Sequence, residues 1–245
     1  SGELVEALAQ AIGPAVIHLG QAVQAVEPLA EPGGSAAGSS PTYRLSLPEA
    51  REWTADRLIL AGPASASAAL LAPWAPDLAA EIRSIPHCSS ALVNLGYDAS
   101  AFRRPLDGYG YVVAAGENHP IRACSWSSTK LEGRAPVGKV LLRAFFGGAG
   151  FEEETRLPDE ELVARAQDAW VSVLGLRGEP ELVRVQRWPE GNPQVAPGHQ
   201  ERMARLEAGL PAGLSLLGAA FHGVGVPDCV RAAETCAAVA ARSTS

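Results

Sequence analysis

A glycine-containing segment near the end of the chain, residues 223–228 with the sequence Gly-Val-Gly-Val-Pro-Asp, has the residue types of an anion-binding turn. The apolar run over 214–218 that precedes it predicts a buried strand. The alanine-rich segment 228–241 predicts a helix, and Pro227 suits its first turn because an N–H at that position has no intrahelical acceptor. A helix that starts at a tight turn directs free N–H groups and its positive dipole end at a ligand. The turn is therefore a candidate ligand site.

This segment matches a dinucleotide-binding fingerprint only in part. The third glycine is absent, and Asp228 stands in its place. No second strand follows before Ser245 to supply an acidic residue for a ribose. A full Rossmann mononucleotide unit is therefore excluded here, and these residues alone favour an ordinary turn at the start of a helix.

The elements before this segment alternate between predicted strands and helices. Apolar residues at helical spacing predict a helix over 3–12, and the Gly/Ser/Ala/Pro-rich stretch 31–40 predicts a loose hairpin loop. Strands are predicted over 15–19, 22–26, 43–47 and 53–60, the last becoming buried at its end, and a turn at 61–64 leads into a helix over 65–71.

The middle of the chain predicts an antiparallel sheet with one helix packed on it. Turn residues separate predicted strands over 88–97, 108–113, 121–128, 139–146 and 182–188. The segment 158–174 predicts an amphipathic helix. Its apolar face is predicted to consist of Leu162, Val163, Ala166, Trp170, Val171 and Leu174.

Composition limits the classes of partner and compartment. The 245 residues, 47% of them hydrophobic, suffice for one large or two small domains with a sizeable core. The net charge of −7 argues against nucleic acid as the main partner, and charges or Pro/Gly interrupt every apolar run, which predicts no transmembrane segment and no signal peptide. The four cysteines form no CxxC pair. Cys229 and Cys236 are predicted to be buried apolar residues, and a reduced, cytoplasmic compartment fits best.

Several short motifs follow one another along the chain. They are Leu106-Asp-Gly-Tyr-Gly-Tyr-Val112, Ser125-Trp-Ser-Ser-Thr-Lys130, Arg134-Ala-Pro136, Arg143-Ala-Phe-Phe-Gly-Gly148, Arg187-Trp188, Pro193-Gln194 and Gly198-His199. With the segment 214–241, their order and spacing resemble the C-terminal half of the FAD-dependent protoporphyrinogen and coproporphyrinogen III oxidases of haem synthesis, members of the flavin amine oxidase superfamily.

The resemblance implies an α/β fold with two functions divided between domains. Residues 1–76 and 191–245 would be the middle and C-terminal parts of a Rossmann-like FAD-binding domain of the amine-oxidase type. Residues 77–190 would be a substrate-binding domain built on the antiparallel sheet. The residues that it assigns to the cofactor are Val23, Trp188, Gly223, Val224, Gly225, Val226 and Asp228. Those that it assigns to the tetrapyrrole cavity are Tyr109, Gly110, Val112 and Phe146.

For several of these residues a purely structural role stays open. Val23 fits the pattern Gly20-x-x-Val23-x-x-Val26 of the strand whose backbone meets the adenine, but a plain sheet valine has the same appearance. Without the motifs around them, Tyr109, Val112 and Phe146 favour core packing of a β domain.

The chemistry implied by the resemblance is the oxidation of a porphyrinogen to a porphyrin, with loss of six electrons and six protons in three flavin cycles and reoxidation by molecular oxygen. FAD carries the difficult step, and the protein supplies orientation and electrostatics. The helix that starts near Pro227 would place its positive end near the flavin. We therefore expect no Ser/His/Asp triad, no catalytic side chain and no metal. His199 is expected to be structural, and His87, His119 and His222 lack ligand spacing.

One part of the family pattern is absent from this sequence. Such enzymes begin with a strand, a GxGxxG turn and a helix that binds the FAD pyrophosphate. We therefore expect the chain alone to bind FAD weakly or not at all, with activity belonging to the complete protein. Alternatives are another flavin amine oxidase, such as a desaturase or a monoamine oxidase, and a non-catalytic tetrapyrrole-binding module. Between the two substrates the composition leans toward coproporphyrinogen III, which carries four carboxylates. Further expectations are ferrochelatase or another haem-pathway enzyme as a partner, and a cytoplasmic location that includes the membrane surface.

Overall fold

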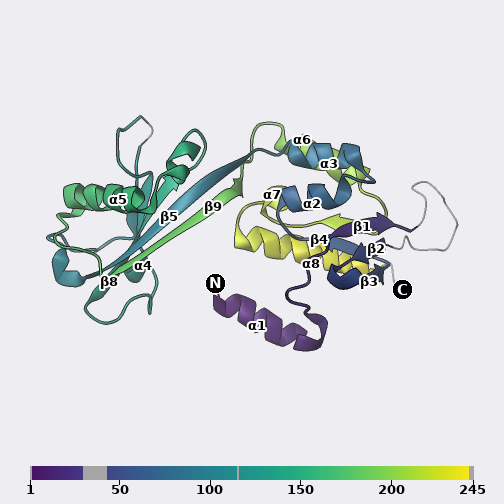
Figure 1. Ribbon diagram of the computed structural model, residues 1–245, viewed down its shortest axis with the longest axis horizontal. Coiled ribbons are helices and arrows are strands. Elements are labelled where there is room, and N and C mark those ends of the chain that lie inside the picture. The colour runs from purple at the N-terminus through teal and green to yellow at the C-terminus, as the bar shows by residue number, and fades with distance from the viewer. Residues whose placement is uncertain (1, 30–42, 115, 243–245) are drawn as a thin grey trace. The chain divides into compact units, whose positions relative to one another are not determined.

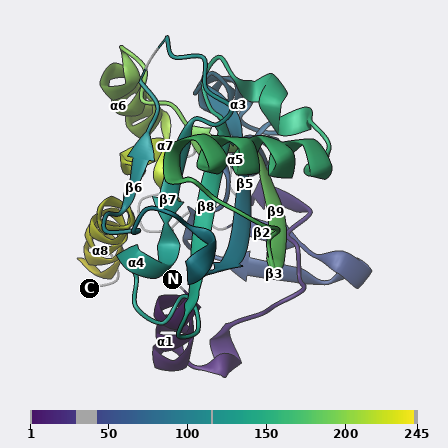
Figure 2. The same ribbon diagram turned by 90° about the vertical axis from the view of Figure 1, so that its left-hand side faces the viewer.

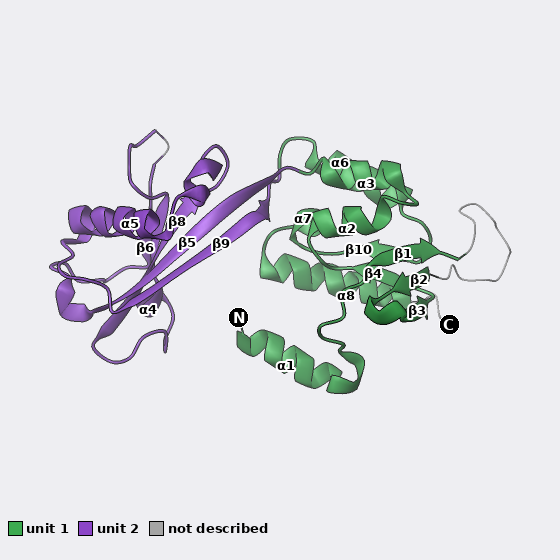
Figure 3. Cartoon of the chain, in the orientation of Figure 1, with its two compact units in different colours: residues 1–85, 196–245 green, residues 86–195 purple. Residues whose placement is uncertain are grey.

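The chain forms two compact units. The computed structural model describes residues 2–29, 43–114 and 116–242 (Figure 1). Unit 1 comprises residues 1–85 and 196–245, and unit 2 comprises residues 86–195 (Figure 3). The boundaries between the units therefore lie between residues 85 and 86 and between residues 195 and 196. The domain boundaries predicted from the sequence lie between 76 and 77 and between 190 and 191. The predicted loop over 31–40 falls outside the described residues.

Unit 1 contains two small sheets. Strands β1 (Ala25–Pro28), β2 (Tyr43–Ser46) and β3 (Glu52–Ala55) form an antiparallel sheet in that order. Strand β4 (Leu58–Leu60) pairs in parallel with β10 (Leu214–Leu216), which brings two distant parts of the sequence together. The helices of unit 1 are α1 (Gly2–Ile12), α2 (Ala64–Leu71), α3 (Pro76–Arg83), α6 (His199–Gly209), α7 (Ala219–His222) and α8 (Val226–Arg242), with short 3-10 turns η1 (Pro14–Val16) and η2 (Pro48–Ala50).

The core of unit 1 follows from the alternation of side chains along β4 and β10. Leu58 and Leu60 on β4, and Leu214 and Leu216 on β10, point to one face and are buried there. They pack with the small-residue face of α2 and with apolar residues of α3 and α6. The intervening residues, among them Ile59, point to the other face of this two-stranded sheet.

Unit 2 is a five-stranded antiparallel sheet with a helix on one face (Figure 2). The strand order is β6 (Gly110–Val112), β7 (Ala123–Trp126), β8 (Lys139–Gly147), β5 (His87–Asp98) and β9 (Leu182–Pro193). The other elements of unit 2 are η3 (Ala99–Ala101), α4 (Ser127–Lys130), η4 (Glu152–Arg156) and α5 (Asp159–Leu174). Of these elements, β5, β8 and α5 are long and strongly periodic in sequence.

Helix α5 packs its apolar face on this sheet. Leu162, Ala166 and Trp170 are fully buried against the sheet residues Val93, Leu95, Leu142, Ala144 and Phe146. Three acidic residues in its first turn suit the positive end of the helix dipole. Val171, which the sequence placed on the packed face, is 54% exposed, because it lies one residue beyond Trp170 and has turned away from the sheet.

Several short elements differ from the sequence-based predictions. Residues 15–19 contain the 3-10 turn η1 rather than a strand, and β1 begins only at Ala25. The single strand predicted over 53–60 is two strands, β3 and β4, which belong to different sheets. Helices α3 and α6 were not predicted, although Pro76 stands in the first turn of α3 in the position that proline favours.

No helix in the described part of the chain combines the length and the apolar character needed to cross a bilayer.

Candidate functional site

The glycine turn before α8 packs tightly around Asp228. Gly223 has a φ of 121°, a conformation that only glycine adopts readily. A Cβ atom at Gly223 would lie 3.0 Å from Cβ of Asp228, and one at Gly225 would lie 2.7 Å from its Oδ2 atom. Gly223 is therefore required by its φ and by the approach of Asp228, whereas a side chain at Gly225 would displace the carboxylate of Asp228.

The same turn presents backbone donors. The carbonyl of Gly225 accepts hydrogen bonds from the N–H groups of Asp228 and Cys229, each at 3.0 Å, and so begins α8. Within the described residues, the N–H groups of 223–226 have no hydrogen-bond partner. Val224 and Val226 are more than 60% exposed. The backbone of the turn is accordingly free to donate hydrogen bonds at the positive end of a helix of 17 residues.

Val23 also has a free backbone. It lies just before β1, and its side chain packs partly against the core of unit 1. Neither its N–H nor its carbonyl has a hydrogen-bond partner in the described part of the chain, although the next residue, Gln24, donates to the carbonyl of Ser46. This arrangement suits recognition of a ligand by the backbone at Val23, which the resemblance implies.

Unit 2 has a second sheet face, opposite α5, that is half-buried to exposed. Side chains directly opposite on neighbouring strands share a face, so the strand pairing defines its rows. One row crosses all five strands as Val112, Ala123, Phe145, Leu92 and Gln186. The next row is Gly110, Ser125, Arg143, Asn94 and Arg184. This face combines apolar side chains with two arginines.

The predicted substrate residues divide between the two faces. Val112 is 83% exposed on the second face, and Tyr109 just before β6 is 69% exposed. Phe146 is only 1% exposed and belongs to the core under α5. Side chains alternate along β8, so Phe145 rather than Phe146 lies on the second face, and the cavity role of Phe146 stays a prediction.

Gly110 has a structural reason to be glycine. Its φ is 131°, and a Cβ atom there would lie 2.0 Å from the carbonyl oxygen of Cys124 on β7. The close approach of β6 to β7 leaves no room for a side chain. Trp188, predicted near the cofactor, lies on the second face of β9 and is 52% exposed.

Arg143 and Asn94 were not predicted as site residues. The Nε atom of Arg143 donates to Oδ1 of Asn94 across the β8–β5 pair, at 2.8 Å. The charged residue in the otherwise apolar stretch 140–146 was a signal that sequence reasoning passed over. Its partner could not be found that way, because the pairing of residues 94 and 143 depends on the strand register.

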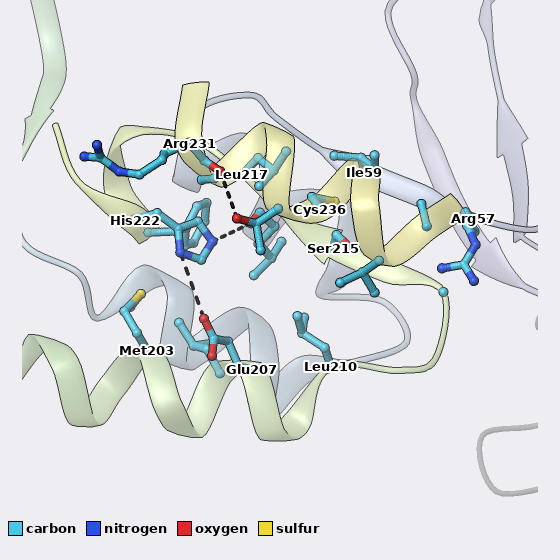
Figure 4. A pocket seen from close by; sticks show the side chains of 18 of the residues that line it. Arg57, Ile59, Met203, Glu207, Leu210, Ser215, Leu217, His222, Arg231 and Cys236 are labelled. Atoms are coloured by element: carbon cyan, nitrogen blue, oxygen red, sulfur yellow. Dashed lines mark hydrogen bonds and ion pairs between the residues drawn. The ribbon is translucent and has the colours of Figure 1, made fainter. Parts of the chain in front are cut away.

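A hollow of about 610 Å³ lies within unit 1. Ile59, Ser215 and Leu217 line one side, on the outer face of β4 and β10, and residues of α6 and α8 line the others. Figure 4 shows His222 between α6 and β10, where its Nε2 atom lies 3.1 Å from the carbonyl oxygen of Leu216 and its Nδ1 atom 4.0 Å from Glu207. The lining is mainly apolar, and its charged or polar residues include Arg57, Glu207, His222, Asp228 and Arg231.

His199, Cys124, Cys229 and Cys236 are partly or fully buried. His199 is the first residue of α6 and is 9% exposed, and its Nδ1 atom is buried without a hydrogen-bond partner among the described residues. Burial raises the pKa of Cys124 to about 12, although Trp170 Nε1 donates a hydrogen bond to its sulfur at 3.1 Å. Cys229 and Cys236 are half-buried rather than buried as predicted. Among the described residues no group of three His, Cys, Asp or Glu side chains could hold a metal ion.

Comparisons with known proteins show which family the chain belongs to. The pattern described as "Flavin containing amine oxidoreductase" matches residues 1–241. Coproporphyrinogen III oxidase of Bacillus subtilis (strain 168) is 33% identical over 195 residues, which are 78% of this chain and 41% of that protein. Coproporphyrinogen III oxidase of Mycobacterium tuberculosis (strain ATCC 25618 / H37Rv) is 41% identical over 182 residues, 74% of this chain and 39% of that protein.

A solved structure is similar over almost the whole chain. It is a candidate protoporphyrinogen oxidase from Exiguobacterium sp. 255-15, with a TM-score of 0.78 and 29% identity. The similarity covers 96% of this chain and 49% of that one. The chain thus spans about two fifths of the length of the curated relatives named above, and about half of this structure.

The family also identifies the cofactor. FAD is the cofactor that belongs with it, as predicted. The free N–H groups of the turn at 223–226, at the positive end of α8, suit the hydrogen-bond-accepting edge of a flavin. The mixed α/β fold with antiparallel sheets agrees with this assignment. The chain belongs to the flavin-containing amine oxidoreductase family.

Proposed function

We propose that this chain is part of an FAD-dependent porphyrinogen oxidase and that coproporphyrinogen III is its substrate. The observation that carries the proposal is the second face of unit 2, which combines apolar side chains with Arg143 on the central strand β8 and Arg184 on the edge strand β9. Such a surface suits a macrocycle with apolar rings and carboxylate side chains. The names of the two curated relatives support the choice of substrate.

The residues of each unit would then have separate tasks. The turn at 223–226 and the free backbone of Val23 would hold FAD, which supplies the electron-accepting chemistry when bound. The apolar residues Val112, Phe145 and Leu92 would support the macrocycle and exclude water. No side chain is assigned the role of acid or base. Oxidation to the porphyrin removes six electrons and six protons, with oxygen as the final acceptor.

The activity is proposed for a longer protein that contains this chain. The relatives are more than twice as long as the segments that match it. The two-stranded β4–β10 sheet supports this proposal, because Ile59 on its outer face is 47% exposed, whereas parallel sheets are normally covered on both faces. Partner enzymes of haem synthesis and a cytoplasmic location stay predictions.

The test is an oxygen-dependent fluorescence assay. The chain, and a version extended at its N-terminus, are each incubated with FAD and coproporphyrinogen III, and the growth of porphyrin emission is compared with autoxidation. We expect catalysed emission from the extended protein and little from the chain alone. Absence of catalysis in both, with FAD bound to the extended protein, would contradict the proposal and favour another flavin amine oxidase.

Protoporphyrinogen IX is the second candidate substrate. The name of the similar Exiguobacterium structure favours it, and the same assay with this substrate compares the two directly. A higher value of kcat/KM for protoporphyrinogen IX would reverse the order of the candidates.

A further inference from the structure

The arginine at the centre of the second face lacks a countercharge. Arg143 is half-buried, and the one hydrogen bond of its side chain in the described residues is the bond from Nε to Asn94. No carboxylate of unit 2's described residues lies within ion-pair distance of Arg143 or of Arg184. A partly buried cation without a countercharge is stabilised when an anion binds beside it, which makes Arg143 a candidate for binding an anionic ligand.

The other arginines packed against this sheet have different surroundings. Arg122 forms an ion pair with Glu154 at 3.3 Å, and Arg187 forms one with Asp159. These two cations lie on the side of the sheet that η4 and α5 cover. The lack of a countercharge therefore distinguishes Arg143 and Arg184, on the second face, from Arg122 and Arg187.

The neighbours of Arg143 fix how its guanidinium is presented. Along β8 the same face carries Leu141 and Phe145, two residues before and after it, and both are half-buried. Asn94 holds Nε, which leaves the two terminal nitrogens to bind another group. A guanidinium with these two nitrogens free matches a carboxylate in a two-pronged geometry.

We propose that Arg143, positioned by Asn94, binds a carboxylate of the porphyrinogen and thereby selects a tetracarboxylate substrate over a dicarboxylate one. This inference rests on the proposed function and adds to it the arginine that recognises the carboxylate side chains of the substrate. Arg184, in the same row on β9, is placed to bind a second carboxylate. Asn94 is a positioning residue, because it acts through Arg143.

The test measures binding of stable porphyrins to the full chain by quenching of their fluorescence. The probes are coproporphyrin III, with four carboxylates, and mesoporphyrin IX, with two. We expect Arg143→Gln to weaken binding of coproporphyrin III about tenfold, and to reduce its dependence on salt concentration. The effect on mesoporphyrin IX should be smaller.

Two further variants separate charge recognition from loss of structure. Asn94→Asp gives Arg143 a carboxylate inside the protein, so it should weaken coproporphyrin binding while leaving the fold at least as stable. Arg165→Gln removes one positive charge from α5, where Arg165 pairs with Glu161 at 2.6 Å on the other side of the sheet, and should leave binding unchanged.

The outcomes distinguish this inference from the proposed function. If coproporphyrin III binds equally to the wild-type chain and Arg143→Gln while the extended protein oxidises coproporphyrinogen III, the carboxylate site is wrong and the proposed function stands. Equal weakening by Arg143→Gln and Arg165→Gln would also overturn it. If neither porphyrin binds to the wild-type chain, the inference fails together with the assignment of the second face to the substrate.

Discussion

At the scale of single residues, the motifs of this sequence combine structural and functional requirements. Gly110 is part of a motif that resembles a substrate-cavity signature, yet the contact between β6 and β7 already demands glycine there. Arg143 begins the motif 143–148 and lies where only strand pairing could reveal its partner, Asn94. A motif therefore marks a place in the fold, and the structure shows which of its side chains can reach a ligand.

Replacement of Gly110 by alanine should destabilise the protein. The new Cβ atom would overlap the carbonyl oxygen of Cys124, so β6 must move away from β7. We expect a loss of about 3 kcal/mol in the free energy of unfolding, measured with urea. Gly138→Ala is the matched control, because Gly138 also has a positive φ, of 79°, but has open space around it. The control should cost about 1 kcal/mol, and equal losses would contradict the proposed overlap.

The cysteines should differ in their reaction with thiol reagents. Cys124 is buried, with a pKa of about 12, whereas Cys229 and Cys236 are half-buried. At mildly alkaline pH we expect alkylation of Cys229 and Cys236 in the native protein and of Cys124 only after unfolding, as mapped by mass spectrometry. Labelling in urea is the control, in which all four cysteines should react. Rapid native labelling of Cys124 would contradict its burial.

The raised pKa of Cys124 also predicts a dependence of stability on pH. The folded protein favours the neutral thiol, so its contribution to stability is complete below the pKa of a thiol in water, about 8.5. That contribution decreases as pH rises from there toward the folded value of about 12. Urea unfolding across this range, with Cys124→Ala for comparison, would detect the difference: the variant should lose less stability than the wild type.

At the scale of elements, Arg187 joins strand β9 to the start of α5. Its guanidinium donates to the carbonyls of Thr155, at 2.8 Å, and Leu157, and pairs with Asp159. Trp188, the next residue, points to the opposite face of the sheet. In the Arg-Trp motif, Arg187 therefore contributes to the packing of β9 against the start of α5, and Trp188 lies on the second face of the sheet.

Substitution of Arg187 by lysine should weaken this junction although it keeps the charge. Lysine presents a single ammonium group, which cannot reach the two carbonyls and the carboxylate in the same geometry. We expect the free energy of unfolding to fall by about 2 kcal/mol. Arg184→Lys, on the same strand but exposed, should change it little. Similar losses for both variants would mean that the contacts of Arg187 with the start of α5 do not contribute to the free energy of unfolding.

The elements that could be predicted from sequence are those with a strong period. Strands β5 and β8 and helix α5 were found because their buried residues recur every second or every third to fourth position. Residues 15–19 have a strand-like composition, but a short 3-10 turn begins at Pro14. The parallel contact of β4 with β10 depends on residues more than 150 positions apart, which no local pattern contains. The same limit applies to the Arg143–Asn94 contact.

At the scale of the whole molecule, unit 2 is inserted into unit 1 through two neighbouring connections. The N–H of Gln194 donates to the carbonyl of Pro86 at 2.8 Å, so the ends of unit 2 lie next to each other. Its core, around Trp170 and Tyr97, is contributed by its own residues. This is the arrangement expected of a domain that folds on its own.

Residues 86–195 should therefore fold when produced alone. We expect a single cooperative transition in urea, followed by circular dichroism and tryptophan fluorescence. Leu142→Ala in this fragment is the companion variant, because Leu142 is fully buried under α5. It should lower the transition midpoint and keep the transition cooperative. A gradual, non-cooperative loss of signal in the wild-type fragment would show that unit 1 is needed for folding.

The irregular end of β9 has a consequence for self-association. In the part of the chain that the structure describes, β9 is an edge strand with no further strand on its outer side. Unpaired edge strands of this kind can pair with a strand of another molecule and lead to aggregation. Pro189 and Pro193 supply no N–H for such pairing, and Glu190 has a φ of 46°, which interrupts the extended backbone. One half of the longest border of the sheet is thereby protected against aggregation, and the other half, at Leu182–Val185, relies on the charge of Arg184 for that protection.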